Sequence, residues 1–492
     1  MTSFSSSFAR WLTPLAAALV LAGCASVAEL PATVATPAQF KEAPTAQAGT
    51  APVQPAGDWW RAFNDPVLDD LVARAAASNT SIQQAAARLA EARALARSVD
   101  ADRSVQVGLN GGASRAQGLD RNQLNYPTTL LNAGASVSYE LDLFGRLSGA
   151  SNAALLDAQG SAASLQSARL LVQAEVAQNY LALRALDDER TLMRDTVEAY
   201  RDTLRLTERR ERAGDLAELD VARVQTELAS TESDALALDR QRALSEHALA
   251  VLLGETASQF SLTREAWRTA LPRIPAGLPS TVLERRPDVL AAQKTVMAAQ
   301  ARVGVAQTAW FPSISLTGGG GYASSDLGDL FKWSARSWGI GALLSLPILD
   351  GGRREAGVQS ASAQLDGALA TYRSQVLVAF REVEDQLASL RLLDEQAAVQ
   401  ARAVSSAARA TSLSDTRYRN GYVSQLDLLD ARRSELRNRR QALQVRSAQY
   451  QATVGLIRAI GGGWGDVQPT AAAEPAAATR MSSATPIEKA LE

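Results

Sequence analysis

The chain has 492 residues, of which 46% are hydrophobic and 21% charged, so it can bury a large core. Lysine and arginine number 50 and aspartate and glutamate 52, and the net charge of −2 indicates neither a nucleic-acid partner nor an anionic membrane surface. The single cysteine and single histidine, Cys24 and His247, exclude an intrachain disulfide, a Cys/His zinc site and an iron–sulfur cluster. No lysine follows a glycine, which excludes a Walker A loop. We therefore expect neither a metal nor a cofactor.

Residues 1–23 have the layout of a lipoprotein signal peptide. Arg10 precedes an apolar stretch, and the segment ends in Leu21-Ala22-Gly23-Cys24, where a cysteine directly after small residues resembles a bacterial lipobox. The resemblance implies cleavage before Cys24 and lipidation of its thiol and its new amino group. An unmodified cysteine behind an ordinary signal peptide is the alternative. Two or more buried acyl chains anchor a protein firmly, and Ala25 after the cysteine implies the lipid of the outer membrane.

The two ends of the remaining chain differ in composition from its middle. Residues 24–57 are rich in Ala, Thr and Pro and are predicted to form an extended, lipid-anchored segment. Residues 465–492 are rich in Ala, Pro, Ser and Thr and are predicted to be a disordered C-terminal tail. Outside the N-terminus no run approaches the ~18–20 apolar residues that a membrane-spanning helix needs, so a helical membrane protein is not expected.

The middle of the chain repeats itself. Dipeptides recur 207 residues apart, for example Gly145-Arg146 as Gly352-Arg353 and Leu219-Asp220 as Leu426-Asp427. Upstream, Ala92-Arg93 matches Ala301-Arg302 and Gly111-Gly112 matches Gly320-Gly321 at a spacing of 209, which predicts a small length difference between Gly112 and Gly145. We predict a first repeat at 58–257, an irregular, proline-containing linker at 258–287 and a second repeat at 288–464.

Each repeat is predicted to begin with a helix and to continue into two strands. A helix is predicted at 66–100, which is rich in Ala, Leu and Arg and has no proline or glycine after Pro66. Residues 288–309 are predicted to form the equivalent helix. Apolar and polar residues then alternate over 105–110 and 136–143, and in the second repeat over 314–317 and 338–346. This alternation predicts four strands, each with one apolar face.

A very long helix is predicted after each pair of strands. Residues 148–213 lack proline, and at 1.5 Å per residue they predict roughly 100 Å of helix. Gly214 and Gly421 are predicted to end the long helices, and return helices then run to Gly254 and Gly461. The second long helix carries a coiled-coil-like seam of apolar residues spaced by three or four: Leu369, Tyr372, Val376, Phe380, Val383, Leu387 and Leu390.

Four strands cannot close a membrane barrel, for which about eight is the smallest number known. Strands of about nine to eleven residues have the length of a tilted membrane strand, which indicates that identical chains pool their strands. Two chains would give eight strands and three would give twelve, and strand number alone does not choose between them. The alternation also suits a soluble sandwich. The long Ala-rich helices fit the staves of a tube that continues such a barrel.

A series of motifs lies in order between residues 58 and 464: Asp58-Trp59-Trp60, Phe63-Asn64-Asp65-Pro66, the run Ser138–Arg146, Leu278-Pro279-Ser280, Arg285-Arg286-Pro287-Asp288, Phe311-Pro312, Asp350-Gly351-Gly352-Arg353, Arg417-Tyr418-Arg419-Asn420-Gly421 and Gly461-Gly462-Gly463-Trp464. These resemble the motifs of outer membrane factor lipoproteins of the NodT family, the TolC/OprM-like channels of tripartite RND-type efflux systems. The resemblance implies a mainly α fold with a membrane β-barrel: a homotrimer whose 12-stranded β-barrel continues into a 12-helix periplasmic α-barrel. It also implies docking to a periplasmic adaptor (membrane fusion) protein and to an inner-membrane RND-type transporter, with no nucleic acid.

The hairpin tips are the candidate sites. In the family that the chain resembles, acidic residues near this tip project into the lumen, which implies a periplasmic gate formed by Asp415 with Arg417 and Arg419. A ring of carboxylates with arginine partners can hold a closed state by ion pairs and favour cations. The alternative is that Asp415 faces solvent on a charged helix end.

The tips themselves are the candidate adaptor contacts, carried by Gly214, Asp215, Asn420 and Gly421. Plain exposed loops are the competing interpretation. Asp220 and Asp427, which open the return helices, are expected to cap them rather than to gate.

The predicted function is that of a passive outer membrane efflux channel, the exit duct of a tripartite pump, and not that of an enzyme. An outer membrane channel for type I protein secretion is a related alternative. A lipid-anchored periplasmic coiled-coil scaffold is an alternative of another class, and it predicts strands that stay soluble and no conductance. A secreted hydrolase is the weakest interpretation, because no nucleophile, base and orienting group occur together.

Overall fold

The computed structural model describes residues 37–43, 57–116, 128–275 and 279–464. The predicted signal peptide at 1–23, the predicted lipid site Cys24 and the tail at 465–492 lie outside the described residues. The helices and strands below all belong to the unit that spans Ala38–Glu492. Among the described helices, none is both long and apolar enough to cross a lipid bilayer.

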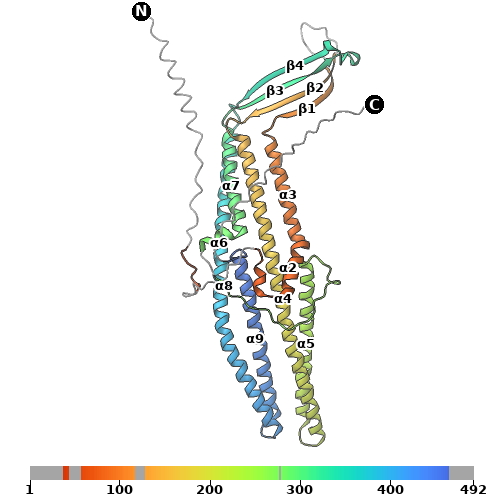
Figure 1. Ribbon diagram of the computed structural model, residues 1–492, viewed down its shortest axis with the longest axis vertical. Coiled ribbons are helices and arrows are strands. Elements are labelled where there is room, and N and C mark those ends of the chain that lie inside the picture. Colours follow the sequence, from red (N-terminus) through yellow and green to blue (C-terminus); the bar gives the residue numbers. More distant parts are fainter. Residues whose placement is uncertain (1–36, 44–56, 117–127, 276–278, 465–492) are drawn as a thin grey trace, which may run out of the picture. The chain divides into compact units, whose positions relative to one another are not determined.

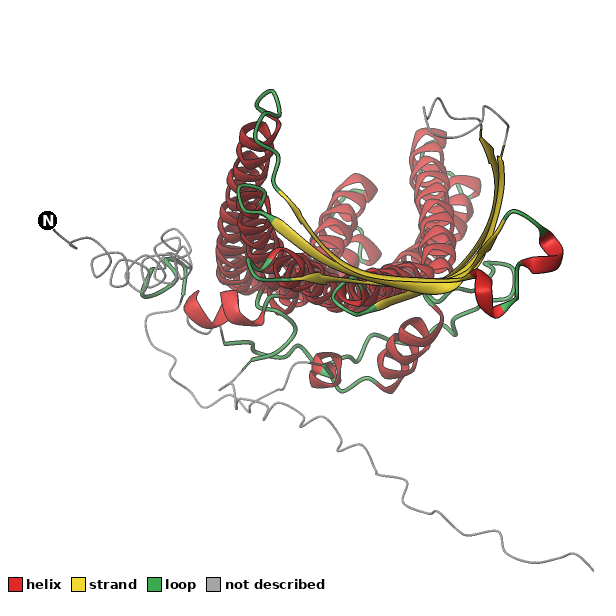
Figure 2. Ribbon diagram, turned by 90° about the horizontal axis from the view of Figure 1, so that it is seen from above, coloured by secondary structure: helices red, strands yellow, loops and turns green. Residues whose placement is uncertain are grey.

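Four strands form one antiparallel sheet in the order in which they occur along the chain (Figure 1). They are β1 (Gln106–Ala116), β2 (Thr128–Leu141), β3 (Ser313–Ser324) and β4 (Arg336–Ser345). Figure 2, seen along the long helices, shows this sheet curved across their ends. Each repeat therefore contributes one strand pair, as predicted. The pairing of β2 with β3 joins the two strand pairs into one sheet.

The register gives the sheet two chemically different faces. Val107 pairs with Val137, Val137 with Gly318, and Gly318 with Ile340, so these four residues share a face. The same face carries most of the large apolar side chains of the strands, namely Leu109, Leu131, Tyr139, Leu141, Ile314, Leu316, Tyr322, Trp338 and Leu344. The opposite face consists mainly of Gly, Ser, Thr and Asn.

The helices also come in matched pairs. The long helices α4 (Arg146–Arg212) and α8 (Arg353–Arg419) have 67 residues each, which is about 100 Å, and the return helices α5 (Glu218–Leu252) and α9 (Gln425–Ala459) have 35 each. Both members of each pair begin and end 207 residues apart. The predicted class, a duplicated strand pair followed by a long helical hairpin, is confirmed.

The predicted spacing of 209 in the upstream part of the repeats is wrong. The helices that precede the strands, α3 (Thr80–Ala101) and α7 (Pro287–Thr308), also begin and end 207 residues apart. In the sheet, Gln106 pairs with Ser138 just as Ser313 pairs with Ser345, again at 207. The identities at 209 fall in an Ala/Arg-rich helix and in the glycine run 318–321, where composition alone produces matches.

The single helix predicted over 66–100 is also wrong, because Asn79 divides it into α2 (Pro66–Ser78) and α3. Asn79 has an extended backbone with ψ of 128°, and its Oδ1 accepts hydrogen bonds from the amides of Ser81 at 2.9 Å and Ile82 at 3.2 Å. Its Nδ2 donates to the carbonyl of Leu252 at 2.8 Å. Asparagine caps the second helix and ties it to the end of α5.

The order in which the helices pack changes along the length of α4 and α8 (Figure 1). In the half next to the sheet, α4 lies between α3 and α7, and α7 packs against α8. In the other half, α4 lies between α5 and α9, and α9 packs against α8. Every level of the layer thus contains four helices, and its two edges are α8 on one side and α3 followed by α5 on the other.

The principal core lies where these two halves meet. It contains Trp59 and Phe63 of the short 3-10 helix η1 (Trp59–Phe63), Tyr180 of α4 and Tyr450 of α9. The seam residues of α8 are buried or half-buried, as predicted. The linker predicted to be irregular is so over the described part up to 275, but it then includes a short helix, α6 (Pro279–Arg285). Two further 3-10 turns, η2 (Leu327–Asp329) and η3 (Trp333–Ala335), lie between β3 and β4.

Candidate functional site

Both helical hairpins reverse at a glycine with a left-handed backbone. Gly214 has φ +84° and Gly421 has φ +77°, a conformation that glycine adopts without strain. After each glycine the next amide reaches back to the helix: Asp215 N donates to Arg210 O, and Tyr422 N donates to Arg417 O, both at 2.9 Å. This Schellman arrangement satisfies the last carbonyls of the long helices, so the predicted helix stops are confirmed.

The predicted adaptor-contact residues lie at these tips. Gly214, Asp215, Asn420 and Gly421 are all exposed, and the Asn420 side chain donates to the carbonyl of Thr416 at 2.8 Å. Their exposure is compatible with a docking surface and equally with plain loops. Their role therefore stays a prediction.

The return helices start differently in the two hairpins. Ser424 and Asp427 form a capping box at the start of α9, and the hydrogen bonds from the Ser424 hydroxyl and amide hold the pKa of Asp427 below its ordinary value. The corresponding position in the first hairpin is Ala217, which has no capping side chain. Asp220 therefore does not cap α5 as expected, because the partner hydroxyl is missing there.

Asp415, the predicted gate residue, is held between two arginines. Its Oδ2 pairs with Arg419 Nε at 2.8 Å, and its Oδ1 pairs with Arg432 Nη2 at 3.1 Å. The Arg419 side chain is 72% exposed and that of Arg432 only 20%. Arg417, the third predicted member of the gate, is exposed and makes no ion pair with any residue that the structure describes. The structure thus brings together Asp415 and Arg419, and it adds Arg432.

Arg432 links the second hairpin to the first. Besides Asp415, its guanidinium donates to the Thr203 hydroxyl and to the Ala199 carbonyl, both on α4, the latter at 3.3 Å. About two turns closer to the tip on α9, Gln425 Nε2 donates to the buried Thr207 hydroxyl at 2.9 Å. These contacts fasten α9 to α4 just above the tips.

The fastening residues escaped the sequence analysis. Gln425 and Arg432 stand at the two ends of a helical stripe whose middle is apolar, Leu428 and Leu429. A polar side chain in line with such a buried stripe was the available signal. What the sequence did not show was that Thr203 and Thr207, on another helix, would face it.

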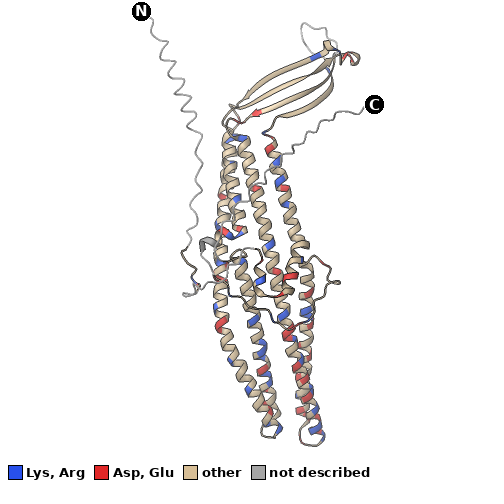
Figure 3. Cartoon of the chain, in the orientation of Figure 1, with Lys and Arg blue, Asp and Glu red and all other residues tan. Residues whose placement is uncertain are grey.

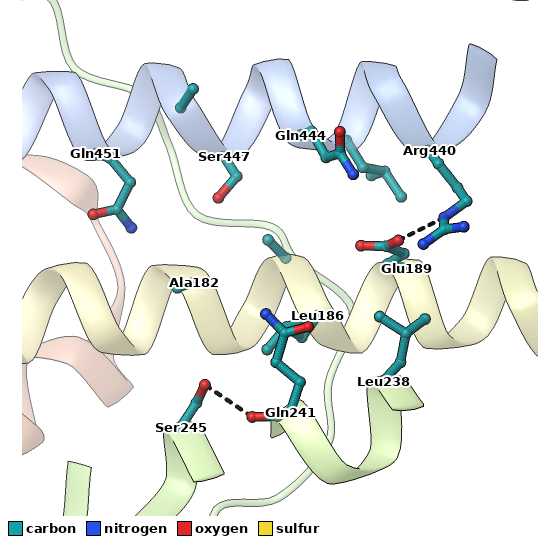
Figure 4. Close-up of a pocket in the computed structure, with 13 residues that line it drawn as sticks. Ala182, Leu186, Glu189, Leu238, Gln241, Ser245, Arg440, Gln444, Ser447 and Gln451 are labelled. Atoms are coloured by element: carbon teal, nitrogen blue, oxygen red, sulfur yellow. Dashed lines mark hydrogen bonds and ion pairs between the residues drawn. The ribbon is translucent and has the colours of Figure 1, made fainter. Parts of the chain in front are cut away.

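Further up, charged contacts continue across the same hairpin boundary. Arg433 of α9 pairs with Glu227 of α5, and this hydrogen bond raises the pKa of the guanidinium. Arg440 pairs with Glu189 of α4 at 2.7 Å at one end of a cleft of about 440 Å³ between α4, α5 and α9 (Figure 4). Figure 3 shows charged residues along all the long helices, whereas the strands are almost free of them.

Comparison with known proteins agrees with this architecture. The outer membrane efflux protein family matches the chain twice, at residues 71–255 and 278–462, two stretches that again lie 207 residues apart. The chain belongs to the outer membrane efflux protein family. It is 32% identical over 463 residues to the pyoverdine export outer membrane protein OpmQ of Pseudomonas aeruginosa, covering 92% of this chain and 97% of that one.

Other members of the outer membrane efflux protein family are similarly related. The cation efflux system protein CusC of Escherichia coli K12 is 30% identical over 455 residues, covering 92% of this chain and 99% of CusC. The crystal structure of the outer membrane protein VceC from Vibrio cholerae superposes with a TM-score of 0.78 at 28% identity, covering 83% of this chain and 99% of VceC. The predicted family and fold class are confirmed, and the protein is a passive efflux channel of the outer membrane. Its relatives are channels, not enzymes.

Proposed function

We propose that three copies of this chain form the exit duct of a tripartite efflux pump. In this assembly a 12-stranded barrel continues into a tunnel of twelve helices, which docks to a periplasmic adaptor and an inner-membrane RND-type transporter. Lipidated Cys24 anchors each copy in the outer membrane. The observation that carries the proposal is that the sheet and the layer of helices each end in edges with exposed apolar side chains.

Within the part of the chain that the structure describes, the outer strands β1 and β4 each pair on one side only. The apolar face near these edges is fully open: Leu109 of β1 is 89% exposed and Ile340 of β4 is 84% exposed. An unpaired strand edge next to such a face is a template for another strand. Closure by further copies removes both edges and presents the apolar face to lipid.

In the helical layer, α5 and α8 carry exposed leucines and valines at spacings that place them on one side of each helix. They are Leu236, Leu244 and Val251 of α5, and Leu392, Val399 and Leu413 of α8. The two open helices lie below the two open strands, so one rotation closes both layers. A head-to-tail contact of this kind generates a closed ring.

At the tips, we propose that Asp415, Arg417 and Arg419 form the periplasmic gate together with Arg432. Repetition around the ring brings the Asp415 carboxylates toward a common axis, where ion pairs resist opening. The exposed loops around Gly214, Asp215, Asn420 and Gly421 would then present the adaptor contact. The ion pairs at Asp415 and the fastening of α9 to α4 support this role.

The cargo is proposed to be small molecules of broad chemistry. Relatives of similar identity are named for pyoverdine export and for cation efflux, so identity does not select a substrate. The polar face of the sheet, made of Gly, Ser, Thr and Asn, offers hydrogen bonds but little charge. Type I protein secretion remains the second candidate, because the same polar wall accepts an extended chain.

The proposal also assigns a role to each predicted part of the chain. In this proposal the repeats at 58–257 and 288–464 each supply a strand pair and a hairpin, and the linker at 258–287 joins the two repeats. The scaffold alternative differs in its physical prediction, since it needs neither closure of the sheet nor a pore.

The decisive experiment is purification from outer membranes in detergent, followed by mass determination and planar bilayer recording. A trimer with stepwise conductance is the expected result. A monomer without conductance steps would favour the scaffold and refute the duct. A Cys24→Ser variant, expected to lose metabolic labelling with fatty acid while the wild type retains it, tests the anchor separately.

A further inference from the structure

We propose that the cleft between α4, α5 and α9 is a binding site for uncharged, amphipathic small molecules on the inner wall of the duct. The cleft has a volume of about 440 Å³, and the ion pair of Glu189 with Arg440 lies at one end of it (Figure 4). Pockets that take drug-sized ligands measure about 300–1,000 Å³. The proposal rests on the duct described above and adds the chemical class of a ligand to it.

The cleft opens on the side of the helices that faces away from the linker. On α4, Arg184 donates to the Thr263 carbonyl of the linker at 2.8 Å. A helix turns by about 100° per residue, so Ala182 and Leu186, which line the cleft, lie about 160° from Arg184 on either side. Both residues therefore point away from the side that the linker covers.

The cleft residues of α9 are arranged in the same way. Arg446 donates to the Trp267 carbonyl of the linker at 3.1 Å, whereas Gln444 and Ala448 of the cleft lie about 160° from Arg446 on either side. Figure 2 shows the layer of helices curved, with short helices and connecting segments on its convex side. The cleft thus opens on the concave side, which becomes the wall of the lumen when copies close into the proposed ring.

The floor of the cleft is apolar. Leu186 of α4 and Leu238 of α5 are buried there, at 8% and 5% exposure. Small side chains keep the space above them open, namely Ala182, Ala185 and Ala448. An apolar ring that covers this floor removes both its own surface and that of the leucines from water, which favours binding.

The rim of the cleft offers hydrogen bonds that the protein does not use. The side chains of Gln241, Gln444 and Ser447 form no hydrogen bond with any residue that the structure describes. Figure 4 shows Gln444 on the α9 side of the cleft and Gln241 on the α5 side. A carboxamide both donates and accepts, so these two side chains complement an amide, carbonyl or hydroxyl group of a ligand that lies between them.

The charged groups at the cleft already have partners within the chain. Arg440 pairs through Nε with Glu189 at 2.7 Å and through Nη1 with Asp234 at 3.5 Å. The Glu189 side chain is only 10% exposed. A charged ligand would gain a partner here only by displacing one of these groups and leaving another charge unpaired, which is costly at a buried carboxylate. The cleft therefore favours an uncharged ligand.

A suitable probe is N-acetyltryptophanamide, which is neutral and combines a flat apolar ring with two amides. At the binding energy per atom typical of drug-sized ligands, its roughly 18 non-hydrogen atoms correspond to a dissociation constant of about 0.1 mM. Saturation-transfer NMR titrations of the purified channel in detergent, with empty micelles subtracted, measure this binding. We expect saturable binding of the amide and several-fold weaker binding of the anionic N-acetyltryptophan and the cationic tryptophanamide.

Three variants locate the binding in the cleft. Gln444→Leu removes one carboxamide and should weaken binding by about 3- to 10-fold, the effect of one lost hydrogen bond. Gln441→Leu is the matched control and should bind like the wild type, because Gln441 is exposed about 60° around α9 from Gln444 and does not line the cleft. Ala182→Phe fills the cleft and should abolish saturable binding.

The cleft assignment is overturned if the neutral amide shows no saturable binding, if either charged analogue binds as tightly, or if Gln444→Leu and Gln441→Leu bind alike. Because Gln444 is exposed, its replacement tests the site even if Ala182→Phe fails to fold. Mass determination and bilayer recording on the same preparation separate this result from the proposed function. A conducting trimer without the binding site leaves the duct intact, whereas a monomer without conductance refutes the duct itself.

Discussion

Replacing Arg432 by alanine should loosen the duct at its periplasmic end. The guanidinium bridges Asp415 on its own hairpin and the Thr203 hydroxyl and Ala199 carbonyl on α4, so the substitution removes three hydrogen bonds at once. Once they are gone, the second hairpin is attached to α4 near the tip by the hydrogen bond from Gln425 to Thr207 and by the contact of the Arg210 guanidinium with the Tyr418 ring. The population in which the tips separate should then rise.

The size of the effect follows from the burial of the side chain. Hydrogen bonds that involve a charged group contribute about 1.5–3 kcal/mol each when buried, and with a side chain that is 20% exposed we take about 2 kcal/mol for the set. That corresponds to a shift of roughly 30-fold in the opening equilibrium. Arg419 is the matched control, because its side chain is 72% exposed and its ion pair with the same carboxylate contributes about 0–1 kcal/mol.

Single-channel recording in planar bilayers measures the outcome as open probability, and entry of a large antibiotic into whole cells measures it in vivo. Arg432→Ala should increase both strongly, and Arg419→Ala by about fivefold at most. Equal channel abundance on immunoblots is required for the comparison. If Arg419→Ala opened the channel as much as Arg432→Ala, the bridge to α4 would not be the restraint and the reasoning would fail.

Two further predictions concern stability and pH. Asp65→Ala should lower the free energy of unfolding by about 3 kcal/mol in denaturant titrations, because this carboxylate caps α2 and accepts hydrogen bonds from the buried hydroxyls of a tyrosine and a threonine. The pKa of Asp427 is lower in the folded protein than in the unfolded chain, so its carboxylate stabilises the second tip at pH values above the unfolded pKa, and this stabilisation is lost as the pH falls through the folded pKa. Ser424→Ala removes a hydrogen bond that lowers the folded pKa. In hydrogen-exchange measurements of α9, the loss of protection in acid should therefore begin at a higher pH in this variant.

The regular elements were predictable because each has a period of its own. Alternation over 314–317 marks β3, and spacings of three and four mark the buried side of α8. Gly214 and Gly421 end the long helices because the reversal needs a positive φ. These signals are local, so they predict each element independently of its packing partners.

Two of the three failures involve a partner that is distant in the sequence. Asn79 interrupts a helical composition because the end of α5, which it bonds through Leu252, comes back beside it. Asp220 resembles Asp427 in sequence but lacks the serine that makes the second a capping box. Arg432 is one of many arginines on α9 until Thr203 of α4 is placed opposite it. Contacts between helices decided the cases of Asn79 and Arg432, whereas that of Asp220 was decided locally by Ala217 at the capping position.

The internal repeat also explains how the non-repeated segments are held. Arg184 of α4 donates to the Thr263 carbonyl at 2.8 Å, and Arg391, its equivalent in α8, pairs with Glu42 at 2.9 Å. Two unrelated segments, one before the first repeat and one after it, are thus bound to the long helices at equivalent positions. Because α4 and α8 correspond residue by residue, the two segments contact the layer of helices at the same distance along these helices.

That level coincides with the main core, which gives the segments a structural task. Phe40 is buried against Phe380, with ring centroids 6.3 Å apart, and Trp267 lies beside Tyr450, at 4.5 Å. Above this level α4 and α8 pack against α3 and α7, and below it against α5 and α9. The two segments therefore cover the junction at which α3 and α7 end and α5 and α9 begin. At this junction the long helices would otherwise have the fewest packing partners.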